Sequence, residues 1–281
     1  MKKDRTFKKF TPMISVIIPT YKPGSYLWKC LDSLESQTMD KQQYEVIIIL
    51  NGCRDPYYEN IIHHVGKYSM NIHVAQTDVA GVSNARNIGL DISKGEQVCF
   101  VDDDDWVSEE YLQQLFSAVK KTGFITVSNV EAIDETSGET RADYLSSVYQ
   151  SLCSQKTVGL LKARRLLSSS CCKMIPKEVI GKDRFNTRLS RGEDALFMAQ
   201  ISSKVKGVAL ADAKAVYFRL LRTGSASRSD KSLKRACCDF LLEEYSFLKV
   251  YLSDLRHYNH LFFMGRFLAV FKGTIIKYFS D

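Results

Sequence analysis

The sequence predicts an α/β protein with a mostly parallel, twisted sheet flanked by helices, followed by a helical C-terminal extension. Two runs, 13–18 and 45–50, are rich in Ile and Val, a pattern typical of strands buried on both faces. Segments with apolar residues at helical spacing lie between such runs, and this alternation is typical of parallel sheets. From residue 231 onward only helical spacing is seen. The 281 residues suffice for one large domain or two small ones.

The expected elements follow from where apolar periodicity starts and stops. The first strand is expected to end at Pro19, and four apolar residues at helical spacing over 27–34 indicate the next helix. There follow a strand over 45–50, a helix over 56–68, a strand over 72–75, a helix over 83–93, a strand over 97–101, a helix capped by Ser108 and a strand over 124–130. The remaining chain is expected to hold a polar loop over 133–143, an irregular segment over 162–194, and helices over 194–205, from 230 and over 260–279.

Polar side chains follow three of the expected parallel strands. They are Pro19-Thr20-Tyr21, Asn51-Gly52 and the four aspartates Asp102 to Asp105. Ligands of open α/β sheets bind beyond the carboxyl ends of the strands. We therefore expect these three segments to converge on one rim and to form the functional site.

The four consecutive aspartates are the most specific chemical signal. Their mutual repulsion is unfavourable unless a cation or many donors compensate for it. Carboxylates suit Mg²⁺ or Mn²⁺, and alternate side chains of an extended chain point the same way, so Asp102 and Asp104 can share one site. The alternative is a solvated acidic turn that caps a helix.

Six segments together resemble the family 2 inverting glycosyltransferases. In chain order they are SVIIPTYK (15–22), EVIIILNGCRD (45–55), AGVSNARNIGL (80–90), FVDDDDW (100–106), RGEDALF (191–197) and YFRLLRTGSASR (217–228). The resemblance implies the GT-A nucleotide-diphospho-sugar transferase fold. It suggests a catalytic domain over 12–230, with a nucleotide-sugar half (12–130) and an acceptor half (131–230), before a helical extension over 231–281.

The resemblance and the chemistry of glycosyl transfer assign roles to these residues. A Mn²⁺ or Mg²⁺ ion is expected on Asp104, helped by Asp102, where it would neutralise the leaving diphosphate. Asp194 is the candidate base and Glu193 is expected to orient the acceptor hydroxyl; the alternative for this pair is the acidic first turn of a helix. The expected nucleotide-sugar contacts are Pro19, Thr20, Tyr21, Asn51, Arg86, Asp102, Asp103, Arg222 and Arg228.

The sequence departs from the family pattern at two places. Leu50-Asn51 replaces the aspartate pair usual at the uracil site, although the amide of Asn51 can both donate to and accept from a base edge. The closing segment 217–228 has no histidine, which some relatives use as an extra metal ligand. The Q-x-x-R-W element of processive synthases is absent as well, which favours the addition of one or a few sugars.

The net charge of +7 fits an anionic ligand or an anionic membrane surface, and without a zinc-finger or RNA-recognition signature we expect no nucleic-acid partner. Eight cysteines without C-x-x-C spacing favour reduced thiols in the cytoplasm. Residues 260–279 form an apolar stripe interrupted by basic residues. This helix either lies on the cytoplasmic face of an anionic membrane or packs on the catalytic domain.

The expected function is transfer of a sugar from a nucleotide-diphosphate donor, a UDP-sugar, to a hydroxyl of a growing glycan in cell-surface polysaccharide or lipopolysaccharide synthesis. The expected acceptors include a glycan that is linked to a lipid. The alternative is an inactive carbohydrate-binding or partner-binding module of the same fold. A phosphatase of the haloacid-dehalogenase type would need its D-x-D-x-[TV] motif near the chain start, and a nucleotidyltransferase would need a glycine-rich basic loop after its first strand.

Overall fold

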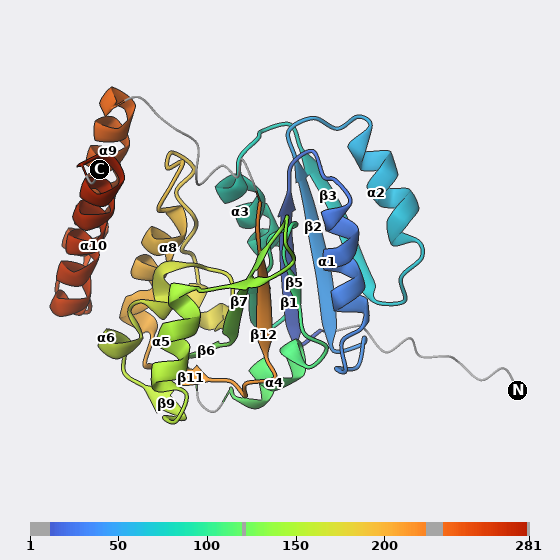
Figure 1. The fold of residues 1–281 in the computed structure, drawn as a ribbon, viewed down its shortest axis with the longest axis horizontal. Helices are drawn as coiled ribbons and strands as arrows, with labels where there is room; N and C mark the ends of the chain where they lie inside the picture. Colours follow the sequence, from blue (N-terminus) through green and yellow to red (C-terminus); the bar gives the residue numbers. More distant parts are fainter. Residues whose placement is uncertain (1–11, 120–121, 223–232, 280–281) are drawn as a thin grey trace, which may run out of the picture.

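The computed structural model describes residues 12–119, 122–222 and 233–279, and it confirms the expected α/β class (Figure 1). The main sheet has the strand order β3-β2-β1-β4-β10-β6-β11-β9. Its strands are β1 (Ile14–Thr20), β2 (Tyr44–Asn51), β3 (Asn71–Thr77), β4 (Gln97–Phe100), β6 (Phe124–Val127), β9 (Thr157–Val158), β10 (Lys173–Pro176) and β11 (Gly207–Leu210). The pairs within β3-β2-β1-β4 are all parallel, whereas β10 runs antiparallel to both its neighbours.

A second sheet has the order β5-β12-β7-β8. Its strands are β5 (Trp106–Val107), β7 (Asn129–Asp134), β8 (Thr140–Arg141) and β12 (Val216–Leu221). The prediction of one strand over 124–130 was wrong, because the chain leaves the main sheet at Ser128 and continues as β7 in the second sheet. The buried Ser128 donates its backbone N–H to the carbonyl of Cys172. The loop expected over 133–143 was also wrong in part, because β7 and β8 pair within it.

The seven helices predicted from apolar periodicity are all present, and the described residues hold three further helices that were not predicted. They are α1 (Tyr26–Glu35), α2 (Tyr57–Val65), α3 (Val82–Ile92), α4 (Tyr111–Ser117), α5 (Tyr144–Leu152), α6 (Leu160–Ala163), α7 (Lys177–Ile180), α8 (Glu193–Ile201), α9 (Leu233–Ser253) and α10 (His260–Phe279), with 3₁₀ turns η1 (Leu166–Ser168) and η2 (Ser202–Lys204). In α1 the four predicted apolar residues are all buried against the sheet. The segment 162–194, expected to be irregular, instead supplies α6, β10 and α7.

Two local predictions were wrong for identifiable reasons. Pro19 does not end the first strand, because it lies inside β1 opposite Ile49. The ladder from β1 to β4 already ends at Ile17, so the missing N–H of proline removes no bond on that side. Ser108 does not cap α4, because its hydroxyl donates to the carbonyl of Lys214 and accepts from the N–H of Val216.

Helix α3 lies unusually close to the central strand β1. A Cβ atom on Gly89 would stand 2.4 Å from Cγ2 of Ile17, a separation at which something must move. Glycine at this position therefore lets the helix pack against the strand. This close packing fixes the first half of α3, which carries Arg86, above the carboxyl ends of β1, β2 and β4.

Helices α9 and α10 form a hairpin beyond α8, at the left edge of Figure 1. Phe262 and Phe263 of α10 are buried, and the guanidinium of Arg266 donates to the carbonyl of Arg164 at 2.6 Å. The hairpin is therefore packed on the rest of the chain through one side. The expected domain boundary at residue 230 falls outside the described residues, so the division at that point stays a prediction.

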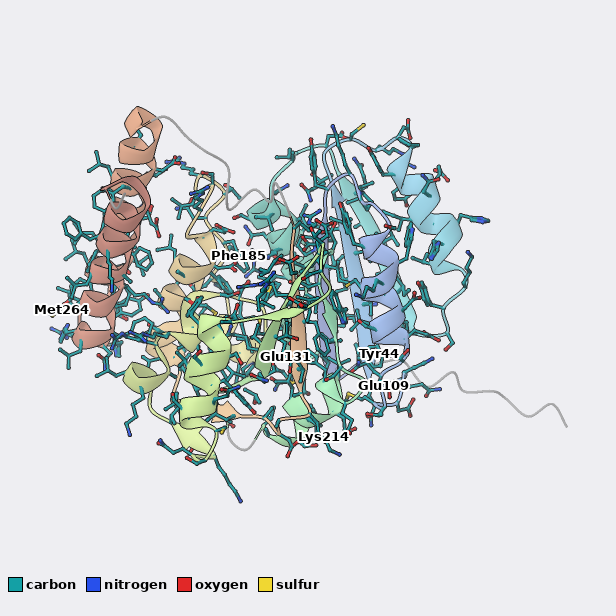
Figure 2. All side chains as sticks on the ribbon, in the orientation of Figure 1. Tyr44, Glu109, Glu131, Phe185, Lys214 and Met264 are labelled. Atoms are coloured by element: carbon teal, nitrogen blue, oxygen red, sulfur yellow. The ribbon has the colours of Figure 1, made fainter. Side chains whose placement is uncertain are left out.

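The opposite side of the hairpin is exposed and apolar. On α10 the exposed side chains are Leu261, Met264, Leu268 and Phe271, and on α9 they include Leu241, Tyr245, Leu248 and Leu252. They are spaced at three and four residues, so each helix presents one outward stripe. Figure 2 labels Met264 on the side of the hairpin that faces away from the sheet. Within the described residues, no helix combines the length and the apolar character needed to cross a bilayer.

Candidate active site

The three polar strand ends predicted to converge are joined by direct contacts. The side-chain amide of Asn51 donates to the carbonyl of Thr20 at 2.7 Å and accepts from the N–H of Gly81 at 2.8 Å. The hydroxyl of Thr20 in turn donates to the carboxyl of Asp103. The ends of β1, β2 and β4 therefore form one hydrogen-bonded rim. Asn51, predicted to meet a base edge, uses its oxygen and one N–H to hold this rim together.

The four aspartates have different environments. Asp105 is buried and accepts hydrogen bonds from the hydroxyl of Tyr217 at 2.7 Å and from the N–H of Leu220 at 2.8 Å. The same tyrosine hydroxyl lies 3.1 Å from the backbone nitrogen of Asp102. Asp105 thus anchors β12 to the acidic segment and is structural. The other three aspartates lie at the rim, where they are available to a ligand.

Asp103 and Asp104 lie in a strongly acidic environment. Burial raises the pKa of Asp103 to about 7, with the neighbouring carboxylates Asp104 and Asp102 adding to the rise. Burial and then Asp102 also raise the pKa of Asp104, against the guanidinium of Arg222. That guanidinium is 2.7 Å from Asp104 and stacks over the ring of Tyr26. Each additional positive charge at this rim would stabilise the ionised carboxylates.

Arg86 links the rim to the segment that carries the candidate base. Its side chain is only 3% exposed, and its two terminal nitrogens lie 2.8 Å from Asp102 and 2.6 Å from Asp194. A planar guanidinium can bridge two carboxylates in this way, which a lysine ammonium cannot match. The predicted contact of Arg86 with the donor diphosphate stays a prediction. The described contacts of Arg86 hold the two acidic segments together.

The residues around Arg86 explain why its motif has this composition. Asn87 exchanges two hydrogen bonds with the backbone of Phe185, at 2.9 and 2.8 Å. Phe185 stacks on Phe197 of α8, and Figure 2 labels it between α8 and α3. The Arg86 guanidinium lies over the Phe185 ring at 5.4 Å. Arg86 therefore provides the shared positive charge, and Asn87 holds α3 to the backbone at Phe185. Gly89 allows the close packing of α3 on β1.

Asp194 is held by donors on both of its oxygens. Oδ1 accepts from Arg86 and from the hydroxyl of Ser170 at 2.9 Å, while Oδ2 accepts from the N–H of Ser170 at 3.2 Å and the hydroxyl of Ser169 at 3.3 Å. These contacts fix the orientation of the carboxylate. The two longest contacts are both on Oδ2, which is therefore the oxygen most open to exchange a partner for an incoming hydroxyl.

Glu193 is less constrained than Asp194. One of its oxygens lies 3.6 Å from Arg86, and burial together with Asp194 raises its pKa. Gly192 before it has φ +73°, and a Cβ there would stand 2.1 Å from Oε1 of Glu243 on α9. Burial, Glu244 and Glu193 raise the pKa of Glu243 to about 7. The C-terminal hairpin thus brings a further carboxyl close to Gly192 and Glu193.

The carboxylates at the rim can hold a hard divalent cation only if a substrate supplies further ligands. Among the described residues no three His, Cys, Asp or Glu side chains gather as a metal site by themselves. Mg²⁺ commonly uses one or two carboxylates together with substrate phosphates, and Asp102 with Asp104 can supply those. The ion pair of Arg222 with Asp104 shows that this carboxylate already attracts a positive charge.

The remaining predicted residues divide between rim and interior. Tyr21 is half exposed and its ring lies against Gly52, where a Cβ would come within 2.7 Å of it, so it is available to a ligand. Pro19 is buried within β1, and Arg228 lies outside the described residues. Ser170 and Glu243 were not predicted. A single serine, or a glutamate within a long helix, has no sequence pattern that would predict its position beside the Glu193–Asp194 pair.

Comparison with known sequences is consistent with this geometry. Residues 15–182 match the family described as "Glycosyl transferase family 2". The chain is similar to a putative glycosyltransferase of Bacillus subtilis, EpsH, with 24% identity over 79% of this chain and 65% of EpsH. It is also similar to the poly(ribitol-phosphate) β-N-acetylglucosaminyltransferase TarS of Staphylococcus aureus, with 26% identity over 75% of this chain and 36% of TarS. The chain thus spans under two thirds of the length of each relative.

Solved structures show the same fold. A crystal structure of residues 1–349 of S. aureus TarS in complex with UDP-GlcNAc superposes with a TM-score of 0.73. The superposition covers 94% of this chain and 73% of that chain, at 21% sequence identity. The likeness reaches beyond the matched family segment and extends into the C-terminal part of the chain.

Proposed function

Because this chain belongs to glycosyl transferase family 2, we propose that it transfers a sugar from a nucleotide-diphosphate donor to a hydroxyl of a growing glycan. The observation that carries the proposal is the bridge made by Arg86. One buried guanidinium contacts Asp102 on the donor rim and Asp194 on the opposite segment. A donor seated on the rim would therefore present its anomeric carbon close to the carboxylate that accepts the acceptor proton.

The donor side consists of the rim and the residues just after β12. Tyr21 is exposed beside Gly52 and is available to stack on a nucleobase. Asp102 and Asp103 are proposed to accept hydrogen bonds from hydroxyls of the ribose and the sugar. Arg222 is proposed to move from Asp104 to the diphosphate, because both are anionic partners for the same guanidinium. UDP is the proposed nucleotide, and UDP-GlcNAc is bound by TarS, which shares this fold.

A divalent cation is proposed as cofactor. Asp104, helped by Asp102, would hold Mn²⁺ or Mg²⁺, whose charge offsets the negative charge that develops on the departing diphosphate. The chain's own residues do the remaining work. Arg86 keeps the rim and the base segment in fixed register, and Asp105 with Tyr217 holds the acidic segment to β12.

The transfer is proposed to be a single displacement. Asp194 takes the proton of the acceptor hydroxyl through Oδ2, replacing the 3.3 Å contact with Ser169. The acceptor oxygen bonds to the anomeric carbon as the bond to the diphosphate breaks, and the nucleoside diphosphate leaves with the electron pair. One displacement inverts the anomeric centre, so an α-linked donor gives a β-linked product. Glu193 is proposed to orient the hydroxyl.

The acceptor is proposed to be a glycan of the cell surface. EpsH and TarS are bacterial proteins, and TarS is named for glycosylation of a ribitol-phosphate polymer. We also propose a location on the cytoplasmic face of the membrane. The outward stripe of α9 and α10, which includes Leu261, Met264 and Leu268, is exposed, and Lys272 beside it would meet anionic headgroups.

Donor screening by thermal denaturation tests the proposal. A ligand that binds only the folded state raises the melting temperature. Nucleotide sugars and free nucleoside diphosphates are each added with and without Mn²⁺. We expect a UDP-sugar with Mn²⁺ to raise the melting temperature, and ADP or GDP to do so less. Absence of any nucleotide-dependent shift would contradict the proposed donor site.

A further inference from the structure

A cavity of about 410 Å³ lies between α8, α9 and the loop before α8. Small-molecule sites commonly occupy about 300–1,000 Å³. The cavity is lined by Leu196 and Gln200 of α8, by Tyr245 and Lys249 of α9, and by Arg184 and Arg188 of the loop, among others. It is separate from the strand ends that form the donor rim, and none of the expected donor contacts lines it.

The cavity continues the face of α8 that carries Glu193. Glu193, Leu196 and Gln200 are spaced by three and four residues, so they lie on one side of the helix. With a rise of about 1.5 Å per residue, Gln200 is about 10 Å along the axis from Glu193. An acceptor whose hydroxyl is held at Glu193 and Asp194 would therefore extend along α8 into this cavity.

The cavity is lined by basic side chains and by no acidic ones. Arg184 is committed to the structure, because it pairs with Asp91 at 2.6 Å and donates to two loop carbonyls. In contrast, the side chains of Arg188 and Lys249 show no ion pair or hydrogen bond within the described part of the chain. Two cations on separate elements suit a tetrahedral anion, which presents oxygens in several directions.

Two other features of the cavity suit an organic group attached to that anion. The amide oxygen of Gln200 is buried and, among the described residues, has no hydrogen-bond partner. Such an acceptor is unfavourable without a donor, and a rotation of the Gln200 side chain is needed to bring it against a sugar hydroxyl in the cavity. The ring of Tyr245, which also belongs to the outward stripe of α9, is 63% exposed at the mouth of the cavity, where it can lie against a sugar ring or a hydrocarbon chain.

We propose that this cavity binds a phosphate group of the acceptor, between Arg188 and Lys249. The inference rests on the proposed function and names the substrate class: an acceptor that carries phosphate a short distance from the attacking hydroxyl. A phosphate on a lipid carrier and a phosphodiester within a soluble polymer share this chemistry.

Isothermal titration calorimetry with matched ligands tests the site. Farnesyl phosphate and glycerol 3-phosphate are the probes, and farnesol and glycerol are their phosphate-free controls. Saturating UDP and Mn²⁺ are present throughout, so that the donor site does not contribute. The cavity variant is Arg188→Gln with Lys249→Gln. The control variant, Lys67→Gln with Lys156→Gln, loses the same charge at two exposed positions elsewhere.

We expect at least one phosphate probe to bind, and the cavity variant to weaken that binding about tenfold or more. The control variant should bind as the wild type does. Binding of farnesyl phosphate alone indicates a lipid-borne phosphate, and binding of both probes indicates recognition of the phosphate group itself. The proposal is overturned if neither probe binds the wild type, or if the cavity variant binds as tightly as the control.

The donor side is measured in the same samples by the rise in melting temperature with UDP. Both double variants should retain it, because their residues are remote from the rim. If UDP binding fails in the wild type while phosphate binding stands, the proposed function is wrong and the anion site remains. If UDP binding stands and phosphate binding fails, only the acceptor inference is wrong.

Discussion

The carboxylate of Asp194 lies 2.6 Å from the buried guanidinium of Arg86. These residues are 108 positions apart in the chain, and the contact joins the start of α8 to the acidic end of β4 through Asp102. A buried guanidinium with two carboxylate partners is well compensated, but removing it leaves both carboxylates without their shared cation. The geometry of the proposed reaction therefore depends on this bridge.

Arg86→Met is expected to reduce the free energy of unfolding by about 2 kcal/mol, since partial exposure of Asp102 and Asp194 moderates the loss of a buried pair. Urea denaturation measures it. Lys214→Met is the matched control, because Lys214 pairs with Glu110 at 3.0 Å on the surface; it should reduce the free energy of unfolding much less, as exposed ion pairs contribute little. Equal losses of unfolding free energy in the two variants would show that the Arg86 bridge stabilises the fold no more than a surface ion pair does.

Asp104→Asn and Asp105→Asn are expected to separate metal binding from folding. Asp104→Asn should abolish the rise in melting temperature that UDP gives with Mn²⁺, and leave the unliganded protein as stable as before. Asp105→Asn should lower the free energy of unfolding by about 1–3 kcal/mol, because its amide cannot accept from both Tyr217 and Leu220. If Asp104→Asn responds to UDP and Mn²⁺ as the wild type does, the metal assignment is wrong.

Glu243→Gln is expected to change how stability depends on pH. The folded protein holds a proton on Glu243 up to about pH 7, because burial, Glu244 and Glu193 raise its pKa, whereas the unfolded chain releases it near pH 4.5. The folded state therefore binds more protons in this window, and stability falls as the pH rises through it. The stability of the Glu243→Gln variant should not fall in this way. Between pH 5 and pH 8 its free energy of unfolding should rise relative to that of the wild type by on the order of 2 kcal/mol.

Urea denaturation at both pH values gives the measurement for Glu243. Glu109→Gln, which changes an exposed glutamate outside this cluster, should keep the pH dependence of the wild type. An unchanged slope in Glu243→Gln would mean that this carboxyl titrates normally and does not sense Glu193.

The outward stripe of α10 is expected to bind anionic membranes. The wild-type chain should sediment with vesicles that contain phosphatidylglycerol, and the triple variant Leu261→Ser, Met264→Ser, Leu268→Ser should remain in the supernatant. These side chains are exposed, so the fold should survive. Ile62→Ser with Ile92→Ser, at exposed sites on α2 and α3, serves as control. Sedimentation of the triple variant at the wild-type level would exclude the stripe as a membrane contact.

The sequence predicted the structure of residues 12–119 better than that of the rest of the chain. Buried parallel strands such as β1 and β2 have a continuous apolar pattern, and their carboxyl ends necessarily share an edge, so the meeting of Thr20, Asn51 and Asp103 was confirmed. The change of sheet at Ser128 could not be read, because both strands continue the same apolar pattern. At this point the hydroxyl of Ser128 donates to the carbonyl of Cys172, 44 residues away, a contact that the local sequence does not reveal.

The candidate site was predicted in its composition and less well in its contacts. The family resemblance named Arg86, Asp102 and Asp194, but only the fold shows that the arginine joins the two carboxylates. Asp105 could not be distinguished from its three neighbours, because its structural role depends on Tyr217 in a distant strand. Glu243 was missed because apolar periodicity shows which face of α9 is apolar. It does not show that a polar residue of α9 lies beside Gly192 and Glu193.

The central claim is tested most directly by following a nucleotide sugar with proton NMR. Wild-type protein with Mn²⁺ and the donor chosen by screening should release UDP, and the first-formed sugar should have the inverted β configuration. Asp194→Asn should still bind the donor but release UDP about a hundredfold more slowly or worse, as expected for loss of a general base. A first-formed sugar of α configuration, or UDP release by Asp194→Asn at the wild-type rate, would contradict the account.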